Sequence, residues 1–319
     1  MLVFMELTWH TAIVDNWTAS QTQGRLPHAM MLTGIAGTGK RAVAAWFARK
    51  RLGLRASTMP EYPVEVPEHA DLRWVTTPED KHTIGIDQVR ELVAQLSLTS
   101  YEGGGKVAVI EPADAMTASA SNALLKTLEE PPGDTLLVLV VDRPGRLPAT
   151  IISRCQRLSL HVPSEDEGRA WLHSFQPGTD WSGALKDAGF APMAAIEGLS
   201  RVDETSALTE ELRAVADGRA TPLKVAAKWA KLEPDFVLGW LSRQIQCCIK
   251  RTELRGTTEP SKIVSDSVLD RIDRQKLFCF LDIINRLRGQ PVGSFNVQLT
   301  FECLLIDWST QLQSLTGTE

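Results

Sequence analysis

A glycine-rich octapeptide near the N-terminus, Gly34 to Arg41, has the residue types and the spacing to hold a phosphate group. It reads GIAGTGKR and follows the phosphate-loop pattern G-x-x-x-x-G-K-[ST] at every position except the last. In such a loop, backbone N–H groups surround the anion and the lysine adds a positive charge. The candidate phosphate-binding residues are Gly34, Gly37, Gly39 and Lys40.

Two groups that nucleotide hydrolysis requires are missing around this loop. Arg41 stands where a hydroxyl side chain would bind Mg²⁺, so this position carries a second cation. After the apolar run KVAVI, Glu111 occupies the place of an acidic metal ligand, but the next residue is Pro112, which cannot act as a base. We therefore expect no hydrolysis here, and the sequence leaves open whether the loop holds a nucleotide or phosphate weakly.

The loop belongs to a series of apolar segments that alternate with helical patterns. The apolar segments are Ala29 to Leu32, Asp71 to Thr76, Lys106 to Ile110 and Thr135 to Val141. Strands that are apolar on both faces and alternate with helices indicate a parallel sheet covered on both sides. We predict an α/β domain over residues 1–163.

Strand signals stop beyond this domain. Residues 164–204 show short helical patterns, interrupted between Gly189 and Pro192, that predict a small helical lid domain. Residues 205–319 show longer amphipathic helices, which predict an all-α domain suited to oligomerisation.

Composition narrows the class of protein. The chain has 319 residues, of which 43% are hydrophobic and 23% charged, as in ordinary globular proteins of two or three domains. Its net charge of −5 argues against coating nucleic acid through overall basicity. The N-terminus lacks the features of a signal peptide, and no apolar run is long enough to cross a bilayer. We expect a cytoplasmic protein without a membrane partner.

The cysteines give no sign of a disulfide framework or a metal site. They are odd in number and include no C-x-x-C pair, which is typical of reduced residues in an intracellular protein. The five are Cys155, Cys247, Cys248, Cys279 and Cys303.

Four segments occur in an order that is typical of one family. They read RLPHAMMLTGIAGTGKRA, IGIDQVREL, KVAVIEPADAMTASASNALLKTLEEPP and RPGRLPATIISRCQRLSL. Together they closely resemble the AAA+ clamp-loader family over residues 8–163, and Phe295 to Trp308 is similar to the final helix of its collar domain. The resemblance implies an α/β AAA+ (P-loop NTPase-like) domain, a lid and a collar. It also implies a hetero-oligomer with gamma/tau-type ATPase and delta-type subunits, which acts on a sliding clamp and primed DNA.

The resemblance gives Arg154, flanked by Ser153 and Cys155, a role outside its own chain. In similar proteins the arginine of this S-R-C motif reaches into the ATP site of the neighbouring subunit. A guanidinium there can donate to the γ-phosphate and stabilise the charge of the transition state. Considered without the family, the same residue is a helix-end arginine paired with a surface carboxylate.

Other positions differ from active members of the family. Asp142 stands where the ATPases carry a polar sensor, and Pro192 stands where their lid carries an arginine. Residues 55–71 lack the four cysteines of a zinc module that many relatives have, so we expect no zinc. We therefore expect a non-hydrolysing subunit that serves a neighbour's active site. The alternatives are an active ATPase subunit of the same assembly and a stand-alone DNA-binding protein.

Two adjacent glutamates, Glu129 and Glu130, end the helical segment SASNALLKTLEE. Adjacent helical residues point about 100° apart, and no nucleophile accompanies this pair. We expect a solvated helix end rather than an acid/base pair.

Overall fold

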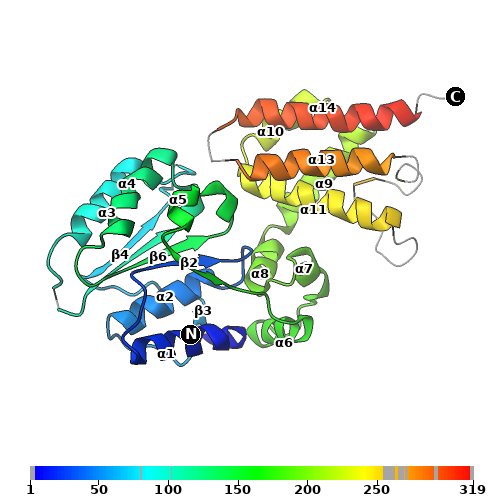
Figure 1. Ribbon diagram of the computed structural model, residues 1–319. Coiled ribbons are helices and arrows are strands. Elements are labelled where there is room, and N and C mark those ends of the chain that lie inside the picture. The colour runs from blue at the N-terminus through cyan, green and yellow to red at the C-terminus, as the bar shows by residue number, and fades with distance from the viewer. Residues whose placement is uncertain are drawn as a thin grey trace. The chain divides into compact units, whose positions relative to one another are not determined.

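The computed structural model describes residues 4–79, 81–101, 103–253, 263–264, 269, 272–290 and 294–316. The chain divides into two compact units, Met1–Leu199 and Ser200–Glu319 (Figure 1). The first unit combines a parallel sheet with helices, and the described part of the second consists of helices. This arrangement confirms the predicted fold class.

The first unit is built on a five-stranded parallel sheet with the strand order β4-β5-β6-β2-β7. The strands are β2 (Ala29–Thr33), β4 (Leu72–Thr76), β5 (Lys106–Glu111), β6 (Thr135–Val141) and β7 (Gln156–Ser159). In the centre, Met30 of β2 lies opposite Val138 of β6 and Gln156 of β7. The first strand of the sheet in the sequence therefore lies between the last two.

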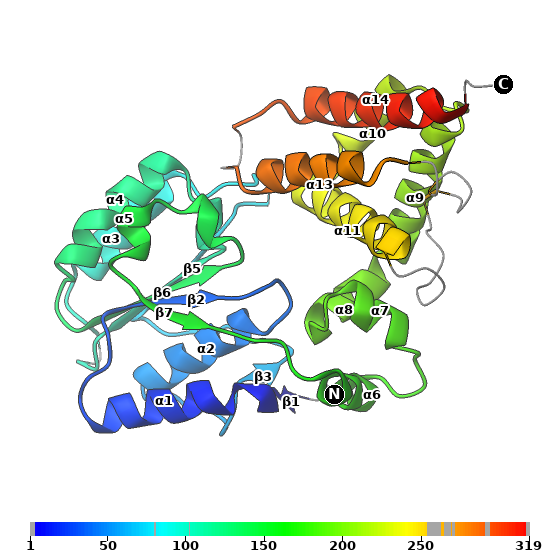
Figure 2. The same cartoon turned by 45° about the vertical axis from the view of Figure 1, so that its right-hand side comes forward.

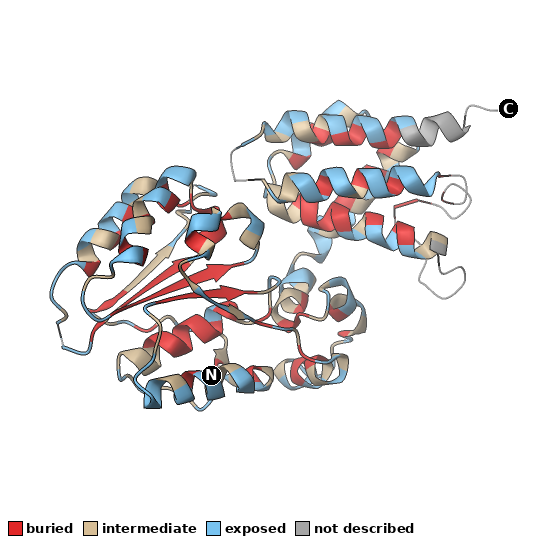
Figure 3. Cartoon of the chain, in the orientation of Figure 1, coloured by how far each residue is buried: buried red, intermediate tan, exposed pale blue. Residues whose placement is uncertain are grey.

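Helices cover both faces of this sheet (Figures 1 and 2). One face carries α1 (Thr11–Thr22) and α2 (Lys40–Arg51), and the other carries α3 (Ile86–Leu96), α4 (Ala118–Glu129) and α5 (Ala149–Ile152). The central strands β2, β5 and β6 are almost entirely buried between these helices (Figure 3). Two apolar layers therefore hold the unit together.

Strand alternation determines which residues enter which layer. Successive strand residues point to opposite faces, so Met31 and Leu139 join the core under α3 and α4. Their neighbours Met30 and Val138 pack on the opposite face with Phe47 of α2. Each such buried side chain contributes roughly 1.5–3 kcal/mol relative to exposure.

The first unit also contains three helices at its C-terminal end and a small second sheet. These helices are α6 (Glu165–Phe175), α7 (Ser182–Asp187) and α8 (Pro192–Ser200). The second sheet pairs β1 (Met5–Glu6) with β3 (Glu61–Tyr62) in antiparallel fashion. Strand β3 lies within residues 55–71, the segment that lacks the four cysteines of a zinc module.

The second unit is a bundle around one apolar core. Its helices are α9 (Val202–Ala216), α10 (Pro222–Trp229), α11 (Pro234–Glu253), α13 (Arg274–Arg288) and α14 (Val297–Thr316). The largest buried side chains of this core include Trp229, Trp240, Trp308, Phe280 and Phe301. The sequence places a domain boundary between residues 204 and 205, which fall inside α9. None of the helices that the structure describes is both long and apolar enough to cross a membrane.

Candidate functional site

The glycine-rich loop lies where a phosphate loop requires it. It follows β2, whose two neighbours in the sheet come from later in the sequence, and it ends where α2 begins at Lys40. Ligands of open α/β sheets bind at such a position, outside the carboxyl end of the strands. Gly37 and Gly39 have φ of +79° and +98°, which glycine adopts without strain. The loop geometry therefore depends on the glycines that the motif supplies.

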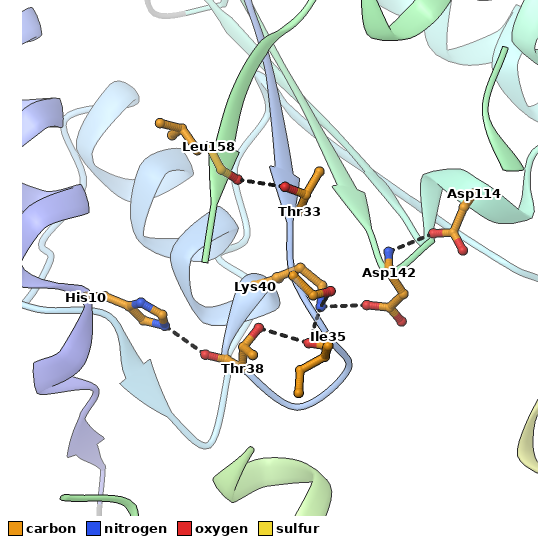
Figure 4. A network of polar contacts seen from close by, with 9 residues as sticks. His10, Thr33, Ile35, Thr38, Lys40, Asp114, Asp142 and Leu158 are labelled. Carbon is orange, nitrogen blue, oxygen red and sulfur yellow. Dashed lines mark hydrogen bonds and ion pairs between the residues drawn. The ribbon is translucent and has the colours of Figure 1, made fainter. Parts of the chain in front are cut away.

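The lysine of the loop is surrounded by oxygens of its own chain (Figure 4). Nζ of Lys40 donates to the carbonyl oxygens of Gly34 and Ile35, at 2.8 and 2.7 Å, and lies 2.6 Å from Oδ1 of Asp142. An ammonium group has three N–H donors, so each of them has a protein oxygen as its acceptor. Because Lys40 is also 95% buried, a phosphate could accept a hydrogen bond from this cation only by displacing one of these three oxygens.

Asp142 is itself held by a second carboxylate (Figure 4). Its backbone N–H donates to Oδ1 of Asp114 at 2.9 Å. Asp114 is buried in the short 3-10 turn that follows β5. Burial raises the pKa of Asp114, and the N–H bond from Asp142 opposes that rise. Sequence reasoning assigned no role to Asp114, since only the folded chain brings the ends of β5 and β6 together.

The two positions where an active P-loop protein would bind Mg²⁺ form an ion pair here. Nη1 of Arg41 lies 3.0 Å from Oε2 of Glu111. The same guanidinium lies over the ring of Trp74, whose Nε1 donates to Oε2 of Glu111 at 3.0 Å. Burial raises the pKa of Glu111, while the charge of Arg41 acts in the opposite direction. Arg41 thus neutralises the carboxylate that a Mg²⁺ ion would need.

The N-terminal segment covers the far side of the loop. Nε2 of His10 lies 2.8 Å from the carbonyl oxygen of Thr38, and Nε1 of Trp9 donates to the same oxygen at 3.3 Å. A carbonyl only accepts hydrogen bonds, so Nε2 of His10 carries the proton. Burial lowers the pKa of His10 to about 4, against a smaller raising effect of the Thr38 bond. The imidazole is therefore neutral at physiological pH.

Helix α8 packs directly on the loop. The N–H of Met193 donates to the carbonyl oxygen of Gly37 at 3.3 Å. A Cβ added to Gly37 would lie 2.3 Å from the backbone nitrogen of Ala194. The expected lid position Pro192 begins this helix and is buried. Sequence reasoning did not foresee these contacts of His10, Trp9 and α8, because no motif marks them.

Arg154 belongs to a separate part of the same unit. It follows the short helix α5, whose C-cap is Ser153. Its Nε donates to Oε1 of Glu129 at 2.9 Å, Nη2 lies 2.5 Å from that oxygen, and Nη1 donates to the carbonyl oxygen of Thr150 at 3.0 Å. Among the described residues, the Arg154 side chain contacts α4 and the end of α5, and it makes none of these contacts with the phosphate loop.

The rest of the S-R-C motif has no nucleophilic character. The Ser153 hydroxyl donates to the carbonyl oxygen of Thr150 at 3.2 Å. Burial raises the pKa of the Cys155 thiol to about 11, so it stays protonated at neutral pH. All five cysteines carry free thiols. Among the described residues, no group of three or more His, Cys, Asp or Glu side chains could hold a metal ion. The expectation that the protein carries no zinc stays a prediction.

Comparison with known proteins shows which proteins this chain is similar to. The family model described as DNA polymerase III, delta subunit, matches residues 9–164. DNA polymerase III subunit delta' of Pseudomonas aeruginosa is 29% identical and aligns with 95% of this chain and 97% of its own length. Subunit tau of Bacillus subtilis is 33% identical over 42% of this chain and 25% of its own length. A gamma-subunit-related structure from Thermotoga maritima covers 97% of this chain and 100% of its own, with 20% identity and a TM-score of 0.45.

The sheet, the phosphate loop after β2 and the matched segment 9–164 define the class of protein, an AAA+ module of the clamp-loader type. An all-α unit follows this module in the chain. The chain is similar to members of the DNA polymerase III clamp-loader family, and to a delta prime subunit along nearly its whole length.

Proposed function

We propose that the chain is a non-hydrolysing subunit of the DNA polymerase III clamp loader and supplies Arg154 as an arginine finger to ATP on a neighbouring subunit. The hydrogen bonds and the ion pair of the Lys40 ammonium group are the observation that supports the non-hydrolysing role. All three of its N–H donors meet oxygens of its own chain, one of them the charged Asp142 carboxylate. A nucleotide competes for this cation with an anion that is already part of the fold.

The surroundings of the loop support the same proposal. Arg41 and Glu111 are paired with each other where a metal ion would be bound. Pro112 follows them, so no carboxylate can activate water at that position. Helix α8 and the segment around His10 contact the loop backbone directly. Binding of nucleotide or phosphate therefore requires several of these contacts to open together.

The proposal for Arg154 is supported by its motif and by its exposure. The ion pair with Glu129 is the contact expected of an ordinary helix-end arginine. However, the Arg154 side chain is 35% exposed. Its contacts with described residues use four of the five N–H groups of the guanidinium, so one N–H is left. It can therefore take a further acceptor from outside the chain.

The partners follow from the family. The similarity to a tau subunit supports a gamma/tau-type ATPase as the neighbour, with a delta-type subunit in the same hetero-oligomer. We propose that the complex works in the cytoplasm, and that the chain meets the sliding clamp and primed DNA as part of it. No cofactor or zinc ion of its own is needed for this role.

The test is a reconstituted complex that carries Arg154→Ala. Arginine fingers accelerate GTP hydrolysis roughly 10³- to 10⁵-fold, so the variant should remove the contribution of the one ATP site that it serves. DNA-stimulated ATP hydrolysis and clamp loading should fall, while size-exclusion chromatography shows an intact complex. Arg90→Ala is the matched control, because Arg90 is an exposed arginine that also faces a carboxylate, Asp87. Unchanged hydrolysis with Arg154→Ala would refute the finger.

Two other functions can be separated from this one with the isolated chain. An active ATPase subunit would hydrolyse MgATP at a rate that Lys40→Ala abolishes. A stand-alone DNA-binding protein would bind primed DNA tightly and in a strongly salt-dependent manner. We expect neither result.

A further inference from the structure

Two adjacent glutamates at the end of α4 have different surroundings. Glu129 accepts from Nε of Arg154 at 2.9 Å and lies 2.5 Å from its Nη2. Glu130 is exposed, and within the described chain its side chain makes no hydrogen bond or ion pair. The expectation that both are solvated therefore misses the contact of Glu129.

Both ends of this contact are anchored in the core. The Thr117 side chain accepts from the N–H of Ala120 at the start of α4, and Leu128 on the last turn is buried. On the other side, Ile151 is fully buried, and its carbonyl oxygen accepts from the N–H of Arg154 at 3.1 Å. The backbones that carry Glu129 and Arg154 are thus held in place by packing.

The contacts divide the guanidinium of Arg154 into an occupied part and an open part. Its side edge, Nε and Nη2, faces a single oxygen of Glu129. Nη1 donates to the carbonyl oxygen of Thr150 at 3.0 Å and to Oγ of Ser153 at 3.4 Å. Of the five N–H groups of a guanidinium, these contacts leave one N–H of Nη2 for an acceptor from outside the chain. A charged N–H donor of this kind forms strong hydrogen bonds to carboxylate or phosphate oxygens.

Stability alone gives little reason for this arrangement. The exposed fractions are 35% for the Arg154 side chain and 51% for that of Glu129. Ion pairs with this exposure contribute little to folding, because water screens them and both side chains lose rotamer freedom. Fixing a long side chain in one orientation does, however, help a group that must meet a reacting phosphate at a defined point.

We infer that Glu129 is the positioning residue for Arg154, holding the side edge of the guanidinium so that the remaining N–H of Nη2 is fixed in one orientation. This inference rests on the proposed role of Arg154 as a finger. The carboxylate also offsets part of the positive charge of the arginine. The orientation of Arg154 therefore matters more to the neighbouring site than the part of its positive charge that Glu129 offsets.

The experiment uses the reconstituted complex with Glu129→Gln, which keeps the length of the side chain and one acceptor oxygen but removes the charge. Glu130→Gln is the matched control, one residue along the chain. We expect Glu129→Gln to lower kcat of DNA-stimulated ATP hydrolysis by at least half of the decrease that Arg154→Ala causes, with KM for ATP unchanged. Glu130→Gln should behave as the wild type. Size-exclusion chromatography verifies assembly of every complex.

A double variant makes the test specific for positioning. If Glu129 acts only through Arg154, Glu129→Gln should have no further effect on kcat in an Arg154→Ala background. A kcat at or above the wild-type value for Glu129→Gln alone overturns the inference, and so does a further decrease in the double variant. An Arg154→Ala complex with full activity contradicts the proposed function instead, so the two failures can be told apart.

Discussion

The ammonium group of Lys40 and the carboxylate of Asp142 lie 2.6 Å apart, directly behind the phosphate loop. The lysine comes from the start of α2 and the aspartate from the end of β6. In a nucleotide-binding loop this cation faces phosphate oxygens. Here an internal anion takes that position, and the two charges are part of the folded structure.

The first prediction concerns the stability that Asp142 confers. Asp142→Asn leaves the buried ammonium of Lys40 with neutral acceptors only, because it removes the negative charge that faces Nζ. Hydrogen bonds to charged groups contribute about 1.5–3 kcal/mol. We expect the free energy of unfolding to fall by about 1–3 kcal/mol, measured by urea denaturation of the full chain. Asp134→Asn is the control, because Asp134 also pairs with an arginine, Arg51, but its side chain is 80% exposed. That change should cost less than about 1 kcal/mol. Equal losses would show that the Lys40 pair has no special contribution.

The second prediction concerns the packing of α8 on the loop. Gly37→Ala places a methyl group 2.3 Å from the backbone nitrogen of Ala194, at a residue whose φ is +79°. Gly24→Ala is the control, since its φ is +64° and a Cβ there meets nothing within 4 Å. Placing alanine at a positive φ destabilises the fold by about 1 kcal/mol in both variants. Overpacking destabilises Gly37→Ala by about 1–3 kcal/mol more. Urea denaturation should therefore rank Gly37→Ala as the less stable. Equal stabilities would mean that α8 does not press on the loop in solution.

The third prediction concerns pH and His10. The pKa of His10 is lowered to about 4 in the folded chain, from 6.5 for an unperturbed histidine. Between these values the unfolded state binds a proton that the native state does not, so stability is lost as pH falls from 6.5 towards 4. Relative to His10→Gln, the wild type should lose about 2 kcal/mol between pH 7 and pH 5.

His10→Gln is a suitable reference because its amide N–H can still donate towards Thr38. All other titrating groups, including Glu111 and Asp114 with their raised pKa values, are shared by the two chains. Urea denaturation at both pH values gives the difference directly. If the two chains respond to pH in parallel, the imidazole is not neutral and buried as the structure shows.

Much of the first unit could be foreseen from local patterns. Strands β2, β5 and β6 are continuous apolar runs, because they are buried on both faces of the sheet. Strand β7 was not predicted. It lies at the sheet edge, pairs only with β2 and leaves most of its side chains exposed, so it has no apolar pattern to recognise. The two-residue strands β1 and β3 are likewise too short to produce a signal.

Some residues of the candidate site can likewise be predicted from the sequence, whereas others cannot. The phosphate loop, Arg41, Pro112 and the S-R-C motif can be identified in the sequence because their residue types and spacing are local. Their partners come from distant segments. His10 lies before the loop, whereas Asp142 and Met193 lie far beyond it. No spacing rule connects such residues before the sheet and α8 are assembled.

The sequence by itself determined the family resemblance, the parallel sheet, and the presence of Arg41 and Pro112 at positions where we expect groups needed for hydrolysis. Only the tertiary structure decided which atoms occupy the positions of the missing ligands. Asp142 reaches Lys40 because parallel strands β2 and β6 are neighbours and their carboxyl ends meet at one edge. Glu129 reaches Arg154 because α4 and α5 pack on the same face of the sheet. Local patterns specify each residue, but the packing of the elements specifies which charges lie close enough to pair.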